Sequence, residues 1–103
     1  EGERTPDLPG ATASLVGMTL ASTTRENLAR AAVEGMLGGL AAGVRALRDR
    51  GVPVRRAILI GGGARSEAVR LIAPEILGVP VIVPEPLEHV ALGAARQAVH
   101  ALG

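Results

Sequence analysis

Residues 57–67 read AILIGGGARSE, a short apolar run that stops at three glycines and continues into the polar pair Ser66-Glu67. The pattern predicts a strand, a glycine turn and the N-terminus of a helix. Glycine has no Cβ, so a ligand can approach the backbone, and the unpaired N–H groups of a helix start suit phosphate. The glycines alone are equally compatible with a tight turn that binds nothing.

Helical and strand-like segments alternate outward from this turn. Spacing of apolar residues and turn signals predicts a helix to about residue 50, a strand over 56–60, a helix over 66–77, a strand over 79–83 and a helix over 88–102. This order is typical of an α/β fold with a parallel sheet and right-handed crossovers. Two or three strands make a thin sheet, so we expect further strands to come from a longer polypeptide or from a partner chain.

The segments around these elements carry more specific signals. Residues 1–22 are expected to form an irregular or hairpin lead-in, with a short strand or hairpin arm over 13–20. Either Thr23 or Thr24 fits an N-cap, and Thr23 with Glu26 has capping-box spacing. The long helix contains four glycines, which suggest close packing against a backbone or ligand, or a break. Its predicted apolar face consists of Leu28, Ala31, Ala32, Met36, Leu40, Val44 and Leu47.

Three further expectations concern where elements end and how they are buried. Gly51 is expected to stop the long helix, and Gly78 the helix over 66–77. Pro74 is expected to kink or shorten that second helix. The run over 56–60 is expected to be a buried strand, because continuous apolar runs are typical of parallel sheets.

Composition excludes several function classes. The 103 residues contain no Phe, Tyr or Trp, so the aromatic stacking platforms on which single-strand nucleic-acid-binding modules rely are missing. They contain no Cys either, so there is neither a disulfide framework nor a thiolate. The formal charge is only +1, and the arginines between Arg45 and Arg56 fit a solvated helix end better than an anionic partner. No apolar run is long enough to cross a membrane, and the chain starts without Met. We therefore expect a cytoplasmic protein from which this chain is a piece.

Other kinds of site are poorly supported. His89 and His100 lie too far apart for a helical metal pair, so no metal site is expected. Glu85 and Glu88 are candidates for a carboxylate pair, although Glu88 at a helix start is explained by the helix dipole. Glu34 is better read as a solvated helix position than as a site residue. The triple glycine has neither the following Lys of a Walker A loop nor dinucleotide-fingerprint spacing.

Four stretches together resemble the C-terminal part of the FGGY carbohydrate kinases. The first is residues 61–67 followed by 76–81, which resembles the adenosine-binding motif of that family. The other three are residues 2–6, residues 17–20 with 27–31 and 34–35, and the closing helix that begins at Glu88. The resemblance covers nearly the whole chain in the right order.

The resemblance implies an actin-like, ribonuclease-H-like ATPase domain, one of two that flank a cleft. It implies transfer of the γ-phosphoryl group of Mg²⁺-bound ATP to a sugar, most plausibly a pentulose, with residues 1–103 as the C-terminal nucleotide-binding part. By position, the ATP-binding residues would be Gly61, Gly62, Gly63, Ala64, Ser66 and Glu67. Gly35 on the long helix would help to line the nucleotide pocket.

The same resemblance places the sugar-binding residues and the catalytic Asp upstream of this chain. No Asp here matches that base, since Asp7 lies in the proline-rich start and Asp49 at a helix end. We therefore expect the chain to be inactive without its N-terminal domain, and self-association to be possible. Two alternatives stay open: a non-enzymatic actin-like ATP switch and an α/β interaction module.

Overall fold

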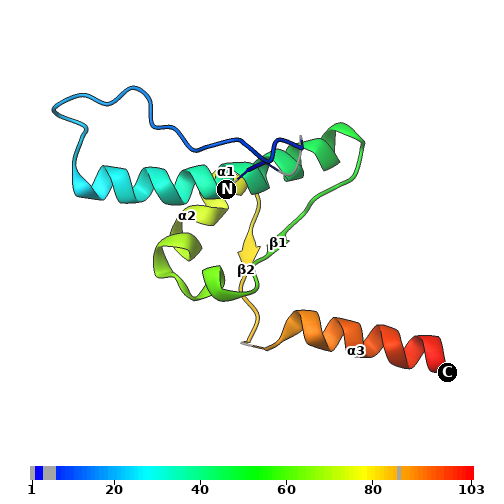
Figure 1. The fold of residues 1–103 in the computed structure, drawn as a ribbon. Coiled ribbons are helices and arrows are strands. Elements are labelled where there is room, and N and C mark those ends of the chain that lie inside the picture. The colour runs from blue at the N-terminus through cyan, green and yellow to red at the C-terminus, as the bar shows by residue number, and fades with distance from the viewer. Residues whose placement is uncertain (1, 4–6, 86) are drawn as a thin grey trace.

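The computed structural model describes residues 2–3, 7–85 and 87–103, so Arg4, Thr5 and Pro6 of the family-like stretch over residues 2–6 lie outside the described residues. The elements occur in the predicted order (Figure 1). They are α1 (Arg25–Asp49), β1 (Ala57–Ile58), the 3₁₀ turn η1 (Gly62–Arg65), α2 (Glu67–Leu77), β2 (Val81–Ile82) and α3 (His89–Leu102).

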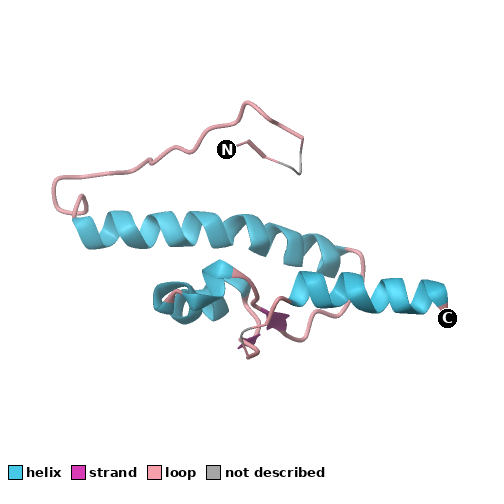
Figure 2. Cartoon of the chain, turned by 60° about the horizontal axis from the view of Figure 1, so that its bottom comes forward, coloured by secondary structure: helices cyan, strands magenta, loops and turns pink. Residues whose placement is uncertain are grey.

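The lead-in differs from the prediction. Residues 13–20 form no strand or hairpin arm, and they run as an extended, exposed segment into α1 (Figure 2). Gly17 interrupts this segment with a φ of +75°, which breaks the alternation that a strand needs. Among the described residues of the lead-in, Glu3 and Leu8 form an antiparallel bridge, and the N–H of Gly2 bonds the Ala11 carbonyl.

Helix α1 begins and ends with well-defined caps. The Thr24 hydroxyl accepts a hydrogen bond from the backbone N–H of Asn27. Thr23 instead donates its hydroxyl to the Thr19 carbonyl at 2.6 Å, so the predicted Thr23–Glu26 capping box is wrong. At the other end Gly51 has a φ of +77°, and the N–H groups of Gly51 and Val52 bond the carbonyls of Arg48 and Leu47. This Schellman motif confirms Gly51 as the stop, and the helix runs unbroken through its four glycines.

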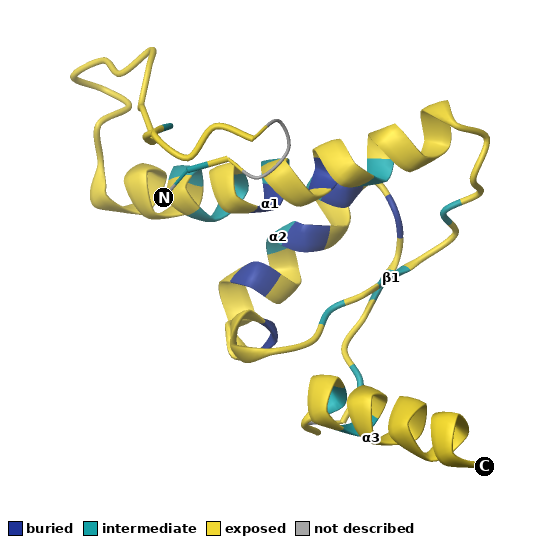
Figure 3. Cartoon of the chain, turned by 45° about the vertical axis from the view of Figure 1, so that its right-hand side comes forward, coloured by how far each residue is buried: buried dark blue, intermediate teal, exposed yellow. Residues whose placement is uncertain are grey.

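The core lies between α1 and α2 (Figure 3). Leu37 and Ala41 of α1 are buried against Val69, Ala73 and Leu77 of α2, and Val79 closes the cluster. The predicted apolar face of α1 is therefore mostly wrong. Of its members only Val44 packs against the core, whereas the following remain exposed: Leu28, Met36, Leu40 and Leu47.

A charged cluster joins the same two helices at the surface. Arg30 pairs with Glu34 one turn along α1 at 2.5 Å and with Glu75 of α2 at 3.1 Å. The hydrogen bond and charge of Glu34, and then those of Glu75, raise the pKa of the Arg30 guanidinium above its ordinary value. Glu34 is thus engaged in an ion pair on the helix surface.

Helix α2 is held by a side-chain cap at its start and a glycine at its end. The Ser66 hydroxyl accepts a hydrogen bond from the N–H of Val69. Gly78 adopts a left-handed conformation with a φ of +62° and bonds the Pro74 carbonyl, which confirms it as the stop. Pro74 does not shorten the helix, which continues to Leu77.

The two strands pair in parallel, as predicted, with Ala57 opposite Val81 and Ile58 opposite Ile82. They are shorter than the segments predicted over 56–60 and 79–83. The expectation of a buried strand is also wrong, because Ile58 and Ile60 are 58% and 45% exposed. Ala57 and Val81 pack against the core that α1 and α2 form, whereas α3 stands apart from these helices with no buried residue (Figures 1 and 3).

Candidate functional site

The glycine turn leaves β1 and folds directly back into α2. Gly61 has a φ of +86°, a conformation that residues with a Cβ rarely adopt. Its carbonyl accepts the N–H of Ala64 at 3.1 Å, and the carbonyl of Gly63 accepts the N–H of Ser66 at 3.1 Å. These bonds form η1, and they bury Ala64 beneath the turn.

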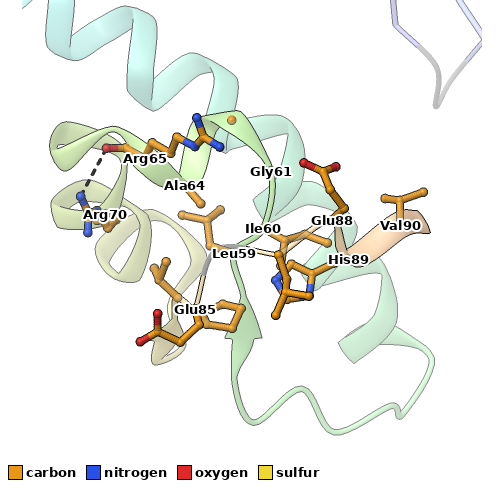
Figure 4. Close-up of a pocket in the computed structure, with 14 residues that line it drawn as sticks. Leu59, Ile60, Gly61, Ala64, Arg65, Arg70, Glu85, Glu88, His89 and Val90 are labelled. Carbon is orange, nitrogen blue, oxygen red and sulfur yellow. Dashed lines mark hydrogen bonds between the residues drawn. The ribbon is translucent and has the colours of Figure 1, made fainter. Parts of the chain in front are cut away.

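A cavity of about 810 Å³ opens beside this turn (Figure 4). It lies at the carboxyl ends of both parallel strands, between the glycine turn that follows β1 and the loop that follows β2. That edge is the usual ligand position in open parallel α/β sheets. The described residues that line it are Leu59, Ile60, Gly61, Gly62, Ala64, Arg65, Arg70, Val83, Pro84, Glu85, Leu87, Glu88, His89 and Val90.

The structure brings some of the predicted ATP-binding residues together and leaves others aside. Gly61, Gly62 and Ala64 line the cavity, whereas Gly63 lies within η1 without lining it. The hydroxyl of Ser66 is engaged in capping α2, and Glu67 is the first residue of that helix. Gly35 is an exposed position on α1 and does not line the cavity. The binding roles of all seven residues stay predictions.

Sequence reasoning missed Arg65, Arg70 and most of the loop after β2. Arg70 lies four residues after Ser66, so helical spacing alone places it on the side of α2 that faces the turn. Pro84 and Pro86 indicate a loop after the second predicted strand. Because the strands were predicted to be parallel, this loop could have been placed at the same edge of the sheet as the glycine turn.

The charged groups of the cavity are segregated. Arg65 and Arg70 come from the turn and α2, whereas Glu85 and Glu88 come from the segment that leads into α3 (Figure 4). The carboxylates of Glu85 and Glu88 lie apart and point in different directions, so the structure does not form the carboxylate pair that was a candidate (Figure 4). Arg65 and Arg70 therefore supply the cationic side chains of the lining, and Leu59 and Ile60 are among its apolar residues.

No group of three or more metal-ligating side chains occurs within residues 2–3, 7–85 and 87–103. His89 lines the cavity but has no second histidine beside it, since His100 is near the end of α3. A Mg²⁺ ion that is held through the phosphates of a bound nucleotide does not need such a group. Among the helices that the structure describes, none is long and apolar enough to cross a membrane.

Comparison with known proteins gives the family. The model of the C-terminal domain of the FGGY family of carbohydrate kinases matches residues 1–102. The chain belongs to the FGGY family of carbohydrate kinases. Within this FGGY chain, the glycine turn and cavity thus lie in the region that matches the C-terminal domain of the family, and the family predicted from the four stretches is confirmed.

Individual relatives agree with this assignment. The FGGY chain is 38% identical over 102 residues to a xylulose kinase of Haemophilus influenzae and 42% identical over 101 residues to one of Streptomyces coelicolor. These alignments cover 99% and 95% of the chain, and 21% and 20% of the relatives. The crystal structure of a xylulose kinase from Bifidobacterium adolescentis matches with 58% identity and a TM-score of 0.79. That match covers 94% of this chain and 19% of the other. The chain thus spans about a fifth of the length of these relatives.

Proposed function

We propose that this chain is the nucleotide-binding part of an ATP-dependent sugar kinase that converts D-xylulose to xylulose 5-phosphate. The observation that carries the proposal is the coincidence of two features at one place. The glycine turn that resembles the family's adenosine-binding motif also lines the cavity at the carboxyl ends of the parallel strands. Membership in a kinase family and similarity to xylulose kinases support the reaction and the sugar.

The cavity suits a nucleotide in size and chemistry. Its volume of about 810 Å³ falls in the range of small-molecule pockets, roughly 300–1,000 Å³. Leu59 and Ile60 offer apolar side chains for a purine, and Arg65 offers a cationic group for phosphate. Because Gly61 and Gly62 carry no side chain, the nucleotide can contact the backbone of the turn directly.

The role of the chain in the reaction is to bind and orient ATP. Phosphoryl transfer depends on positioning and on neutralising charge by several parts of an enzyme together. The base that would accept the proton of the sugar hydroxyl is expected upstream, because neither Asp7 nor Asp49 lines the cavity. Mg²⁺ would be held chiefly by the phosphates of ATP. The actin-like fold of the whole domain, the N-terminal domain as partner and a cytoplasmic location belong to the same proposal.

The deciding experiment measures ADP release by the full-length protein that carries this chain, against a panel of pentuloses, hexoses and polyols that includes D-xylulose. We expect release that depends on D-xylulose. ADP release with another sugar would support the proposed kinase activity but contradict D-xylulose as the substrate. Tight ATP binding without ADP release on any sugar would favour a non-enzymatic ATP switch. If the protein neither binds ATP nor releases ADP, the glycine turn is only a structural feature and the interaction module is favoured.

A further inference from the structure

Arg70 reaches back from α2 to the glycine turn. Its Nη2 donates a hydrogen bond to the backbone carbonyl of Arg65 at 3.3 Å, across five residues (Figure 4). Arg65 is the last residue of η1, and the residue before it, Ala64, lines the cavity. The bond therefore joins the first turns of α2 to the end of the turn on which the cavity is built.

The position of this bond complements the other bonds of the turn. The Gly61–Ala64 and Gly63–Ser66 backbone bonds close the turn internally. Ser66 joins the end of the turn to α2, because its carbonyl accepts the N–H of Arg70 at 3.1 Å and its hydroxyl accepts the N–H of Val69. The guanidinium of Arg70 adds a second connection one residue earlier, at the Arg65 carbonyl, and it does so with a charged donor.

We propose that Arg70 is a positioning residue that fixes the glycine turn for nucleotide binding through the Arg65 carbonyl. The inference rests on the proposed function of this cavity. Loss of the guanidinium leaves η1 closed internally and joined to α2 through Ser66 alone, so the Gly61–Arg65 part of the turn is held less firmly and a nucleotide must order it when it binds. That ordering cost falls on every ligand of the turn, whether or not it carries phosphate.

A direct contact between Arg70 and phosphate would behave differently, since Arg70 itself lines the cavity. Such a contact would weaken ATP binding and leave adenosine binding intact. The two roles are therefore separated by comparing ligands with and without phosphates.

The test uses Arg70→Met in the full-length protein, with Arg96→Met on α3 as the matched control, because Arg96 does not line the cavity. We expect the dissociation constants of adenosine and of ATP to rise by the same factor, about fivefold, as for loss of one hydrogen bond. The KM for ATP should rise while the KM for the sugar stays constant. Hydrogen exchange of the backbone amides of residues 61–66 should become faster, with α3 unchanged.

Three outcomes would overturn the inference. A loss confined to ATP would assign Arg70 to phosphate contact. Unchanged nucleotide affinity in Arg70→Met, with normal affinity in the wild type, would remove Arg70 from the site and leave the proposed function intact. A wild-type protein that binds neither ligand would overturn the proposed function, and the role of Arg70 with it.

Discussion

The three glycines of the turn differ in what they require of the backbone. Gly61 has a φ of +86°, so any side chain there is strained. Gly62 has no positive φ, and a Cβ built on it would meet open space. The fold therefore explains why Gly61 is glycine, but it gives no reason for Gly62. A ligand that approaches the backbone at Gly62 supplies that reason.

The first prediction concerns Gly62→Val in the full-length protein. Gly62 lines the cavity and a Cβ built on it meets no protein atom, so we expect the branched side chain to obstruct the nucleotide. We expect the KM for ATP to rise about tenfold or more, equivalent to about 1.4 kcal/mol or more of lost binding. The KM for the sugar should change little, because the sugar-binding residues are expected upstream. Steady-state kinetics with each substrate varied in turn measures both constants.

Gly39→Val is the matched control for this substitution. Gly39 is an exposed position on α1 with open space around a built Cβ, and it does not line the cavity. Valine is also tolerated better than glycine in a helix interior. The control should keep the wild-type KM for ATP. If Gly62→Val keeps it too, Gly62 does not belong to the nucleotide site.

At the scale of one helix, the sequence was sufficient for the bounds of α1 but not for its buried face. Gly51 and the threonines signal the two ends by local backbone chemistry, which does not depend on partners. The buried face depends on where α2 lies. Helix α1 carries small or apolar residues around much of its circumference, so its periodicity also fits the exposed stripe that contains Met36 and Leu40. Leu37, 1% exposed, was missed for that reason.

The prediction at this scale separates Thr24 from Thr23, which the sequence left as equal candidates for the cap. Thr24→Ala removes the acceptor for the Asn27 N–H and should cost about 1 kcal/mol of local helix stability. Amide hydrogen exchange in the first two turns of α1 should then become about fivefold faster. Thr23→Ala removes a hydroxyl that bonds the Thr19 carbonyl outside the helix, so exchange within α1 should stay unchanged. Equal acceleration in both variants would contradict the assigned cap.

At the scale of the whole molecule, the candidate site is formed by segments that are distant in sequence. The turn side of the cavity was predictable, because three glycines between a strand and a helix are a local signal. The opposite side, which is lined by residues 83–85 and 87–90, follows only from the parallel pairing of β1 and β2, because that pairing brings both carboxyl ends to one edge. The strands were predicted to be parallel, but their short length and half-open faces were not. A sheet buried on both faces needs a second covering layer, and α3 stands away from it.

This half-open architecture leads to the last prediction, which concerns the 103-residue chain by itself. Ile58 and Ile82 expose apolar side chains on the small sheet, and α3 carries Val90, Val99 and Leu102 on its surface. Apolar surface of this kind marks contacts with other protein. The cavity itself is built from residues of this chain, whereas no aspartate among its described lining residues is placed to act as a base.

The chain alone should therefore be inactive even under conditions in which it binds ATP. We expect no ADP release above the background without sugar, because phosphoryl transfer needs the base, the sugar and the charge-neutralising groups in one arrangement. A coupled ADP assay on the isolated chain with D-xylulose measures this, and the full-length protein under the same conditions is the control. ADP release by the isolated chain that depends on the sugar would contradict the prediction, because the catalytic base would then have to lie among these 103 residues.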